Sequence, residues 1–177
     1  MPFLTVCVVV LNEEKVLLTK RDDFHVWCLP SGGVEDGETV VDAAVRETKE
    51  ETGIEVKITR LVGIYSRPAD TPSGHAIVFT AIPIGGKLCI QPGETLETRY
   101  FPFNDLPTAL SFGHRRRIED AIQGVSSAVI LQRPDNLTSQ ITNRKELYLL
   151  RDQSGLSPEQ FYIAYFRPDH IDEERLL

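Results

Sequence analysis

The sequence has few cysteines and no long apolar run, and each scarcity excludes a class of protein. Three cysteines in 177 residues are too few, and odd in number, for a disulfide framework, so we expect reduced thiols and a cytoplasmic protein. The longest apolar run, residues 6–11, is far shorter than the ~20 residues of a membrane-spanning helix. No basic region of a signal peptide precedes that run, and we expect no membrane partner.

Basic charge is also scarce. The chain has 19 Lys and Arg against 26 Asp and Glu, which gives a net charge of −7. A general nucleic-acid binder usually carries a basic face, so we expect no nucleic-acid partner. Phosphate-containing substrates are still compatible with this balance, because bound metal ions reverse the local sign of charge.

The first three quarters of the chain alternate short β-like runs with turns and contain two helical patterns. Strands are predicted at residues 3–11, 15–19, 55–65, 75–82, 87–91 and 98–103. The first helix is predicted to begin after Thr39, a good N-cap residue, and to end at Gly53, where a left-handed conformation is favoured. The second is predicted over residues 111–123. This order indicates an α/β (α+β) domain over residues 1–132, with a mixed sheet and helices on its faces.

Residues 133–177 differ in sequence pattern from the preceding domain and are predicted to form a short C-terminal helical extension. Residues 133–141 are polar and contain a proline, as in a linker. Two helices are predicted at 143–153 and 158–166, the second capped by Ser157. The extension carries large apolar side chains, namely Leu147, Leu150, Phe161 and Phe166. A pair of helices is too small to bury them alone, so we expect it to dock on the main domain or on a partner chain in a homodimer.

Most of the negative charge lies in residues 32–54, which hold seven acids and two bases. On a helix, Glu47, Glu50 and Glu51 share an arc of about 100°, beside the apolar stripe. Carboxylates this close repel one another by a few tenths of a kcal/mol per pair, which is about the size of the helpful ion pairs nearby. A solvated acidic face is one interpretation. A site for a hard cation such as Mg²⁺ is the other, because such ions need clustered carboxylates.

The spacing of this segment resembles a family signature. Gly32 is followed after five residues by Glu38 and after seven more by Arg46-Glu-Thr-Lys-Glu-Glu-Thr-Gly-Ile54. This is similar to the Nudix hydrolase pattern G-x5-E-x7-R-E-U-x-E-E-x-G-U, in which U is a bulky apolar residue. Only Thr48 departs from it, and we expect that side chain to face the core. The resemblance covers about residues 1–125 and implies a Nudix-type α/β/α sandwich.

The resemblance implies a pyrophosphohydrolase that uses Mg²⁺ or Mn²⁺ to cleave a nucleoside diphosphate derivative by attack of water on phosphorus. Glu47, Glu50 and Glu51 would be the metal ligands, together with the carbonyl of Gly32. Such ions neutralise phosphate oxygens and lower the pKa of bound water.

Arg46 and Glu38 would then orient Glu47 through a charge-assisted hydrogen bond. For Arg46, an ion pair on the helix surface is an alternative that fits the same spacing. The resemblance also implies a general base, which would be either Glu47 or an acid on a later loop, where Glu94 and Glu97 are the candidates.

Residues for substrate binding are suggested by position alone. Lys20 and Arg21 end a predicted strand before the motif, where they can meet a phosphate or a base. Trp27 either stacks on a base or belongs to the core. The basic run at residues 114–117 has two interpretations, a phosphate-binding segment or a solvated turn. It opens a predicted helix far from the motif in sequence, so we favour the solvated turn.

The substrate class is open at this level. Pro68, fourteen residues past Ile54, is similar to a proline of the ADP-ribose branch, which favours ADP-ribose or a nucleotide sugar. A (deoxy)nucleoside triphosphate is the alternative. A third possibility is a Nudix-type sensor with a helical DNA-binding module, but residues 143–177 are net acidic and no acid of the motif is missing.

Overall fold

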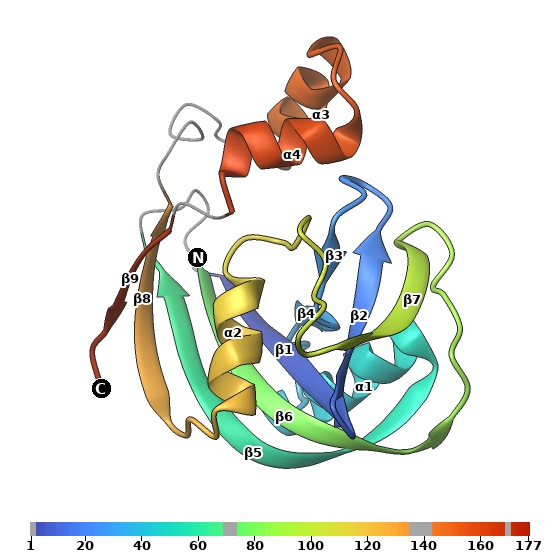
Figure 1. The fold of residues 1–177 in the computed structure, drawn as a ribbon, viewed down its shortest axis with the longest axis vertical. Helices are drawn as coiled ribbons and strands as arrows, with labels where there is room; N and C mark the ends of the chain where they lie inside the picture. Colours follow the sequence, from blue (N-terminus) through green and yellow to red (C-terminus); the bar gives the residue numbers. More distant parts are fainter. Residues whose placement is uncertain (1–2, 69–73, 135–142, 169–170) are drawn as a thin grey trace.

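The computed structural model describes residues 3–68, 74–134, 143–168 and 171–177. The main sheet contains β1 (Phe3–Asn12), β5 (Ile54–Arg67), β6 (Gly74–Gly86), β8 (Ala128–Pro134) and β9 (Ile171–Arg175). β1 runs parallel to β6 and β5 runs parallel to β8, whereas β5 with β6 and β8 with β9 are antiparallel (Figure 1). The predicted mixed sheet is therefore confirmed.

A second antiparallel layer extends from the β1–β2 hairpin. It contains β2 (Lys15–Arg21), β3 (Trp27–Cys28) and β7 (Thr95–Pro102). β2 pairs with both other strands, while β4 (Ser31–Gly33) turns back to pair with β1. The β4 pairing brings the glycine turn of the motif onto the main sheet, next to the helix that follows.

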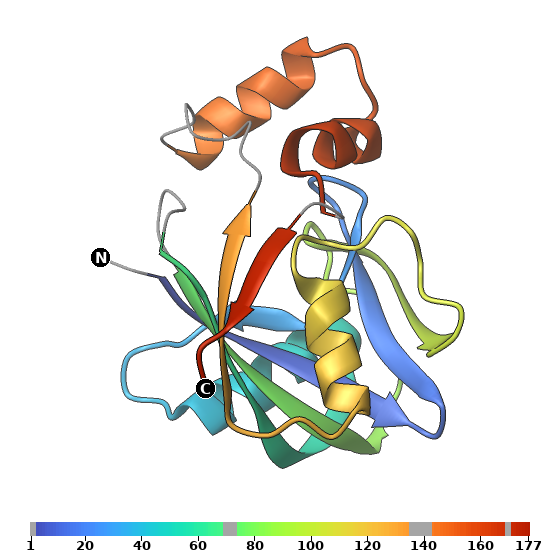
Figure 2. The ribbon, with the colours of Figure 1, turned by 60° about the vertical axis from the view of Figure 1, so that its left-hand side comes forward.

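Two helices cover opposite faces of the main sheet, as Figures 1 and 2 show. α1 (Val40–Thr52) buries Ala43 and Ala44 against β1, β5 and β6. α2 (His114–Ile122) buries Ile118 and Ala121 against the other face. This arrangement gives two apolar layers with the sheet between them, which is the α/β/α sandwich that the sequence predicted.

The signals at the ends of α1 explain why its prediction holds. Thr39 accepts a hydrogen bond from the Asp42 amide at 3.1 Å, and Gly53 adopts a left-handed φ of 73°. Thr48 is fully buried, as its position on the helix predicted, and its hydroxyl donates to the Ala44 carbonyl at 2.7 Å. A polar residue is tolerated in this apolar position because its only donor is satisfied within the helix.

Three local predictions differ from the structure. Residues 87–91 are not a strand: they form an irregular connection that leads to Glu94 and the start of β7. β8 and β9 were not predicted, and the expected domain boundary at residue 132 falls inside β8. β9 has the sequence Ile-Asp-Glu-Glu-Arg, which lacks the apolar alternation of a strand, and its partner lies about 40 residues earlier. Most of the predicted linker, residues 135–141, lies outside the described residues.

The C-terminal extension packs on its own main domain. α3 (Arg144–Gln153) and α4 (Pro158–Phe166) lie across one end of the sheets, above the β2–β3 loop (Figure 2). Phe161 is 2% and Tyr162 5% exposed, in a cluster with Phe24 and Phe112. Docking within one chain thus accounts for the apolar side chains of α4, and a homodimer stays a prediction. None of the helices in the described segments is long and apolar enough to cross a membrane.

Candidate active site

A cleft of about 830 Å³ lies between the main domain and the C-terminal extension. Its walls come from β1, β2, β4, α1, the turn before β7, α2 and the two C-terminal helices. The charged residues along it are Asp22, Asp23, Glu51 and Glu94 together with Arg21, Arg67, Arg117, Arg144 and Arg151. The cleft therefore brings acidic and basic side chains together from parts of the chain more than 100 residues apart.

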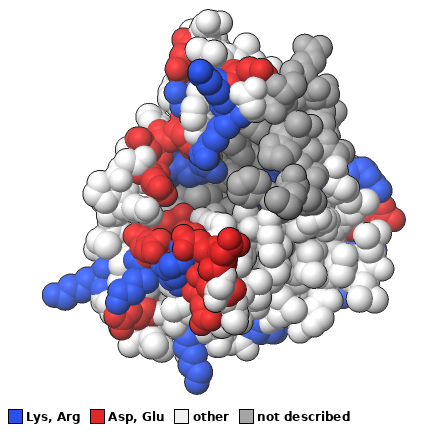
Figure 3. Space-filling model, turned by 180° about the vertical axis from the view of Figure 1, so that it is seen from behind, with Lys and Arg blue, Asp and Glu red and all other residues white. Residues whose placement is uncertain are grey.

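Arg46 lies at the centre of the acidic side chains on α1. Its guanidinium group contacts both oxygens of Glu38, at 2.6 and 3.1 Å, and reaches Glu47 at 2.9 Å and Glu50 at 3.3 Å. It also donates to the Gly33 carbonyl at 3.1 Å. In Figure 3, acidic side chains gather on one face of the molecule with basic atoms among them. The repulsion expected between Glu47 and Glu50 is thus offset by one arginine that contacts both carboxylates.

Gly32 makes room for the carboxylate of Glu47. A β-carbon at position 32 would overlap that carboxylate, so only glycine allows so close an approach between the turn and α1. Burial raises the pKa of Glu47, although its contact with Arg46 acts in the opposite direction. A carboxylate and a backbone turn are thereby held side by side at the edge of the cleft.

Glu51 is the most enclosed acid of the motif. It accepts a hydrogen bond from the Ser31 amide at 3.2 Å, across the gap between α1 and β4. Burial first, and then the charges of Glu47 and Glu94, raise its pKa to about 8, even though the Ser31 amide opposes the shift. Three carboxyl groups close together in a partly dry place favour a bound cation, because only opposite charge offsets their repulsion.

The carboxylates of α1 are not arranged around one position where a metal ion would bind. Among the residues that the structure describes, no three His, Cys, Asp or Glu side chains are grouped in a way that could hold a metal ion. Arg46 instead binds Glu47 and Glu50. The donor set nevertheless fits a divalent cation, because it is all oxygen, crowded by negative charge and bordered by the Gly32 turn.

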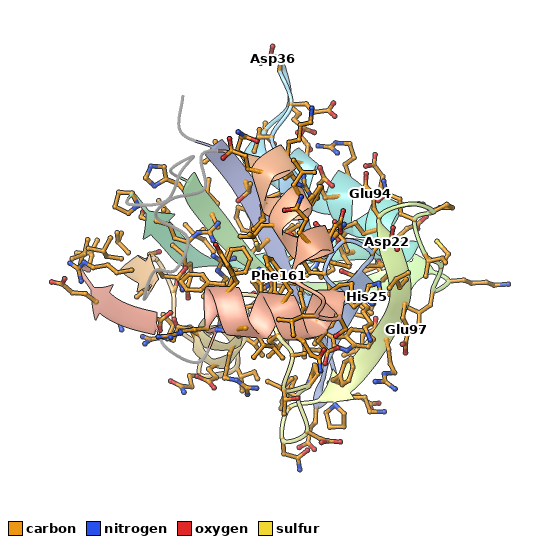
Figure 4. All side chains as sticks on the ribbon, turned by 90° about the horizontal axis from the view of Figure 1, so that it is seen from above. Asp22, His25, Asp36, Glu94, Glu97 and Phe161 are labelled. Carbon is orange, nitrogen blue, oxygen red and sulfur yellow. The ribbon has the colours of Figure 1, made fainter. Side chains whose placement is uncertain are left out.

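The two loop candidates for the general base lie in different places. Glu94 lines the cleft, and its charge contributes to the raised pKa of Glu51 after burial and Glu47. Glu97 pairs in register with Lys20 on the neighbouring strand and contacts Arg99 at 3.6 Å. In Figure 4, Glu94 lies near Asp22 and α1, whereas Glu97 lies farther along β7. The structure brings only Glu94 of this pair to the cleft.

The three residues suggested for substrate binding also lie in different places. Arg21 lines the cleft, where both of its contacts with Asp23 are short, at 2.8 and 2.5 Å. Trp27 is 6% exposed and packs edge-on against Phe101 with 4.6 Å between ring centroids, as in the core interpretation. Lys20 lies over the Trp27 ring at 6.0 Å, and neither residue lines the cleft.

The interpretation of residues 114–117 as a solvated turn is wrong for two of them. His114 is 7% and Arg117 3% exposed, and both line the cleft. A usable signal was present in the sequence: positions 114, 117, 118 and 121 have the spacing i, i+3, i+4, i+7 of a buried helix face. Their polar character concealed it, because histidine and arginine are rarely buried without a specific partner.

A second set of cleft residues comes from α3. Tyr148 donates to the carboxylate of Asp23 at 3.0 Å, Arg144 pairs with the same carboxylate at 3.2 Å, and Arg151 donates to the Asp23 carbonyl at 2.5 Å. Contacts with Arg21, Tyr148 and Arg144 lower the pKa of Asp23, although burial alone would raise it. Asp23 therefore joins the β2–β3 loop to the extension and fixes one wall of the cleft.

Comparisons with known proteins agree with this geometry. A family model described as the NUDIX domain matches residues 1–121. The chain is 42% identical over 125 residues to a protein of Methanocaldococcus jannaschii named ADP-ribose pyrophosphatase, a match that covers 67% of this chain and 72% of that protein. It is 33% identical over 135 residues to a Bacillus subtilis protein named putative 8-oxo-dGTP diphosphatase, with 76% and 89% covered.

A solved structure shows the same fold. The crystal structure of a NUDIX hydrolase from Nitrosomonas europaea superposes with a TM-score of 0.63 and 32% sequence identity, covering 71% of this chain and 75% of that one. The family model, the identity to relatives and the fold all point the same way as the spacing of the acidic motif. The chain belongs to the Nudix hydrolase family.

Proposed function

We propose that the protein is a Mg²⁺-dependent pyrophosphohydrolase of nucleoside diphosphate derivatives, of the ADP-ribose or nucleotide-sugar type. One observation carries the proposal: Glu51, whose pKa the charges of Glu47 and Glu94 help to raise, borders the same cleft as Glu94 and five arginines. A substrate that is a polyanion, bound together with a divalent cation, complements both charges at once.

The metal would be held by Glu47, Glu50 and Glu51 and by the carbonyl of Gly32. Bound there, Mg²⁺ or Mn²⁺ would neutralise phosphate oxygens and lower the pKa of a water molecule. Arg46 is a positioning residue: its contacts with Glu38 and Gly33 hold its guanidinium group in place, and it in turn fixes Glu47. The same arginine keeps the acidic helix stable when no cation is bound.

Glu94 is the general base in this proposal. It removes a proton from the attacking water as the new bond from oxygen to phosphorus forms. The bond between that phosphorus and the bridging oxygen breaks, and the leaving group departs as a phosphomonoester. Hydrolysis of ADP-ribose in this way yields AMP and ribose 5-phosphate. No redox partner is needed.

The choice of substrate rests on similarity. The relative from M. jannaschii, at 42% identity, is named for ADP-ribose, and Pro68 stands at the end of β5 where the ADP-ribose branch carries a proline. The B. subtilis relative favours a second candidate, a (deoxy)nucleoside triphosphate that would be hydrolysed with release of pyrophosphate. The two candidates differ in their products.

A panel of nucleotides tests the proposal. ADP-ribose, nucleotide sugars and nucleoside triphosphates are each incubated with the protein and Mg²⁺, with and without excess chelator, and the products are separated. We expect a nucleoside monophosphate as the main product from the first two, with the highest kcat/KM for one of them. Release of pyrophosphate from triphosphates at a higher kcat/KM would instead support the second candidate, and turnover in chelator would contradict both.

A further inference from the structure

The floor of the cleft contains a buried cation, Arg117, that forms no ion pair with any residue the structure describes. Arg117 is 3% exposed. Its Nη1 lies 3.3 Å from the Cys7 sulfur, and its Nη2 donates to the side-chain oxygen of Gln132 at 3.2 Å. Its Nε has no hydrogen-bond partner within the described segments, and its nearest ring contact is Tyr65 at 5.4 Å. Burial of a charge is costly unless an opposite charge accompanies it.

The acids nearest to Arg117 serve other groups. Glu173 accepts a hydrogen bond from Gln132 at 2.7 Å and pairs with Arg116 at 3.5 Å. Asp120 binds Arg116 at 2.9 Å and accepts the hydroxyl hydrogen of Tyr65 at 2.6 Å. These acids therefore balance Arg116, and within the described segments neither of them forms an ion pair with Arg117.

His114 adds a second donor at the same place. The amide of Leu29 donates to His114 Nδ1 at 2.9 Å, so that nitrogen carries no proton. Burial, followed by the charges of three nearby guanidinium groups, holds the pKa of His114 well below its ordinary value, so the ring is neutral and its proton lies on Nε2. That nitrogen is 3.3 Å from Nη1 of Arg117. Two donors this close to each other are suited to share one acceptor, such as an oxygen of a bound anion.

The position of this pair relates it to the acidic motif. Cys7, which Arg117 contacts, is the register partner of Ser31, and the Ser31 amide donates to Glu51. Paired strands bring such residues to about 5 Å. The donors of α2 and the carboxylate of Glu51 are therefore connected through a single strand pair, and all of them line one cleft.

We propose that His114 and Arg117 form a phosphate-binding subsite, which holds the phosphoryl group of the substrate that is not held at the acidic motif. The inference rests on the proposed function, in that a pyrophosphate-containing nucleotide lies in this cleft. Arginine suits the role because its planar group donates two parallel hydrogen bonds to phosphate oxygens. The same chemistry would accept free orthophosphate, so the test must separate the two sources.

The test measures anion binding without metal, by titration calorimetry in excess chelator with orthophosphate, pyrophosphate and ADP-ribose. Arg117→Met removes the buried charge, and His114→Asn keeps an acceptor for the Leu29 amide while removing the Nε2 donor. Arg115→Gln is the matched control, because Arg115 is exposed on the same helix and its side chain reaches only the Pro107 carbonyl, at 3.3 Å. We expect Arg117→Met to weaken pyrophosphate and ADP-ribose binding about tenfold or more and His114→Asn to weaken it several-fold. Arg115→Gln should change it by less than about twofold.

Each outcome decides between the alternatives. Arg117-dependent binding of pyrophosphate and ADP-ribose, much tighter than that of orthophosphate, supports a substrate subsite, while equally tight orthophosphate identifies free phosphate as a ligand of the same site. Wild-type protein that binds none of the three, or an Arg117→Met variant that binds them as wild type does, overturns the subsite. Should Arg117→Met not fold, unchanged binding by His114→Asn is the overturning result.

Failure of the subsite is distinguishable from failure of the proposed function. If wild type hydrolyses nucleotides with metal, and both variants bind anions as wild type does, the proposed function stands and the subsite is overturned. If pyrophosphate binding depends on Arg117 but the protein hydrolyses no nucleotide, the anion-binding subsite stands and the proposed function is overturned. The unfolding temperature of ligand-free Arg117→Met should equal or exceed that of wild type, because the substitution removes an unbalanced buried charge.

Discussion

Helices α1 and α2 cover opposite faces of one sheet and carry charge of opposite sign to the same cleft. Glu47 and Glu50 of α1 are balanced within the molecule, because Arg46 contacts both of them and also Glu38, just before the helix. Arg117 on α2 has only neutral partners among the residues that the structure describes. The first helix is thus stable without a ligand and still has a carboxylate, Glu51, that favours a cation. The second helix is incomplete without an anion.

This difference indicates how the two ends of the cleft would act. A cation bound beside Glu51 relieves repulsion among groups that are already held in place, so it adds stability as well as chemistry. An anion bound at Arg117 neutralises a positive charge that is already buried in the folded protein. A polyanion with its metal satisfies both requirements, and neither alone satisfies the whole cleft.

Removal of the metal should have the largest effect. We expect excess chelator to reduce hydrolysis of ADP-ribose by at least ~10³-fold, because the divalent cation would neutralise phosphate oxygens and lower the pKa of the attacking water. Activity is measured with chelator and again after Mg²⁺ is restored in excess. Recovery of activity serves as the control for protein damage. Turnover that persists in chelator would break the comparison, because α1 would then need no cation.

The second-largest effect is expected from substitution of Glu94, compared with the same substitution of Glu97. Glu94→Gln is expected to lower kcat by about 10²-fold, because it removes the proposed base from beside Glu51 while leaving the volume of the side chain unchanged. Glu97→Gln is the matched control and should retain kcat within about twofold, because its carboxylate contacts only the exposed Arg99. No loss in either variant would assign the base to Glu47, and equal losses in both would contradict the distinction between Glu94 and Glu97.

Substitution of Phe161 tests whether the extension supports α2. The Tyr162 hydroxyl accepts the Phe112 amide at 2.8 Å, two residues before α2 begins, so α4 holds the entry to that helix. Phe161→Ala should lower the free energy of unfolding by about 3–5 kcal/mol, because a fully buried ring is lost. It should also weaken pyrophosphate binding, which the subsite on α2 supports. Ile163→Ala, at an exposed position of the same helix, should change stability by about 0.5 kcal/mol or less.

The same contrast explains what could be predicted from the sequence. α1 was predictable because its caps are local, at Thr39 and Gly53, and because its acids follow a fixed spacing. The contact of Arg46 with Glu38 was predicted too, since both belong to that spacing. Residues 87–91 were mistaken for a strand because alternating apolar side chains there remain half-exposed in an irregular segment.

The features that could not be predicted from the sequence depend on contacts between distant parts of the chain. β8 and β9 pair across about 40 residues, and the sequence of β9 carries no sign of its partner. The burial of His114 depends on the Leu29 amide, 85 residues away in the chain. Arg117 reaches Cys7 over a separation of 110 residues. A polar helix face can be identified as buried only when such partners are known, so the basic half of the cleft was missed.

The last prediction, on Glu51→Gln, concerns the state of α1 without metal. With a folded pKa of about 8, above the ordinary value of 4.5, Glu51 binds its proton more tightly in the folded state. In chelator, wild-type stability should therefore fall as the pH rises from about 5 to 8, by at most ~1.4 kcal/mol per pH unit. Glutamine carries no charge, so the variant should lack this loss and unfold a few degrees above wild type at pH 8. Thermal scans at pH 5 and pH 8 measure the difference. The half-exposed Glu50→Gln is the control: because it keeps Glu51, it should lose stability between pH 5 and pH 8 as wild type does. A gap between Glu51→Gln and wild type that stays constant with pH would mean that Glu51 is already charge-balanced by Arg21 or Arg46, and that α1 favours a cation no more than any other surface helix does.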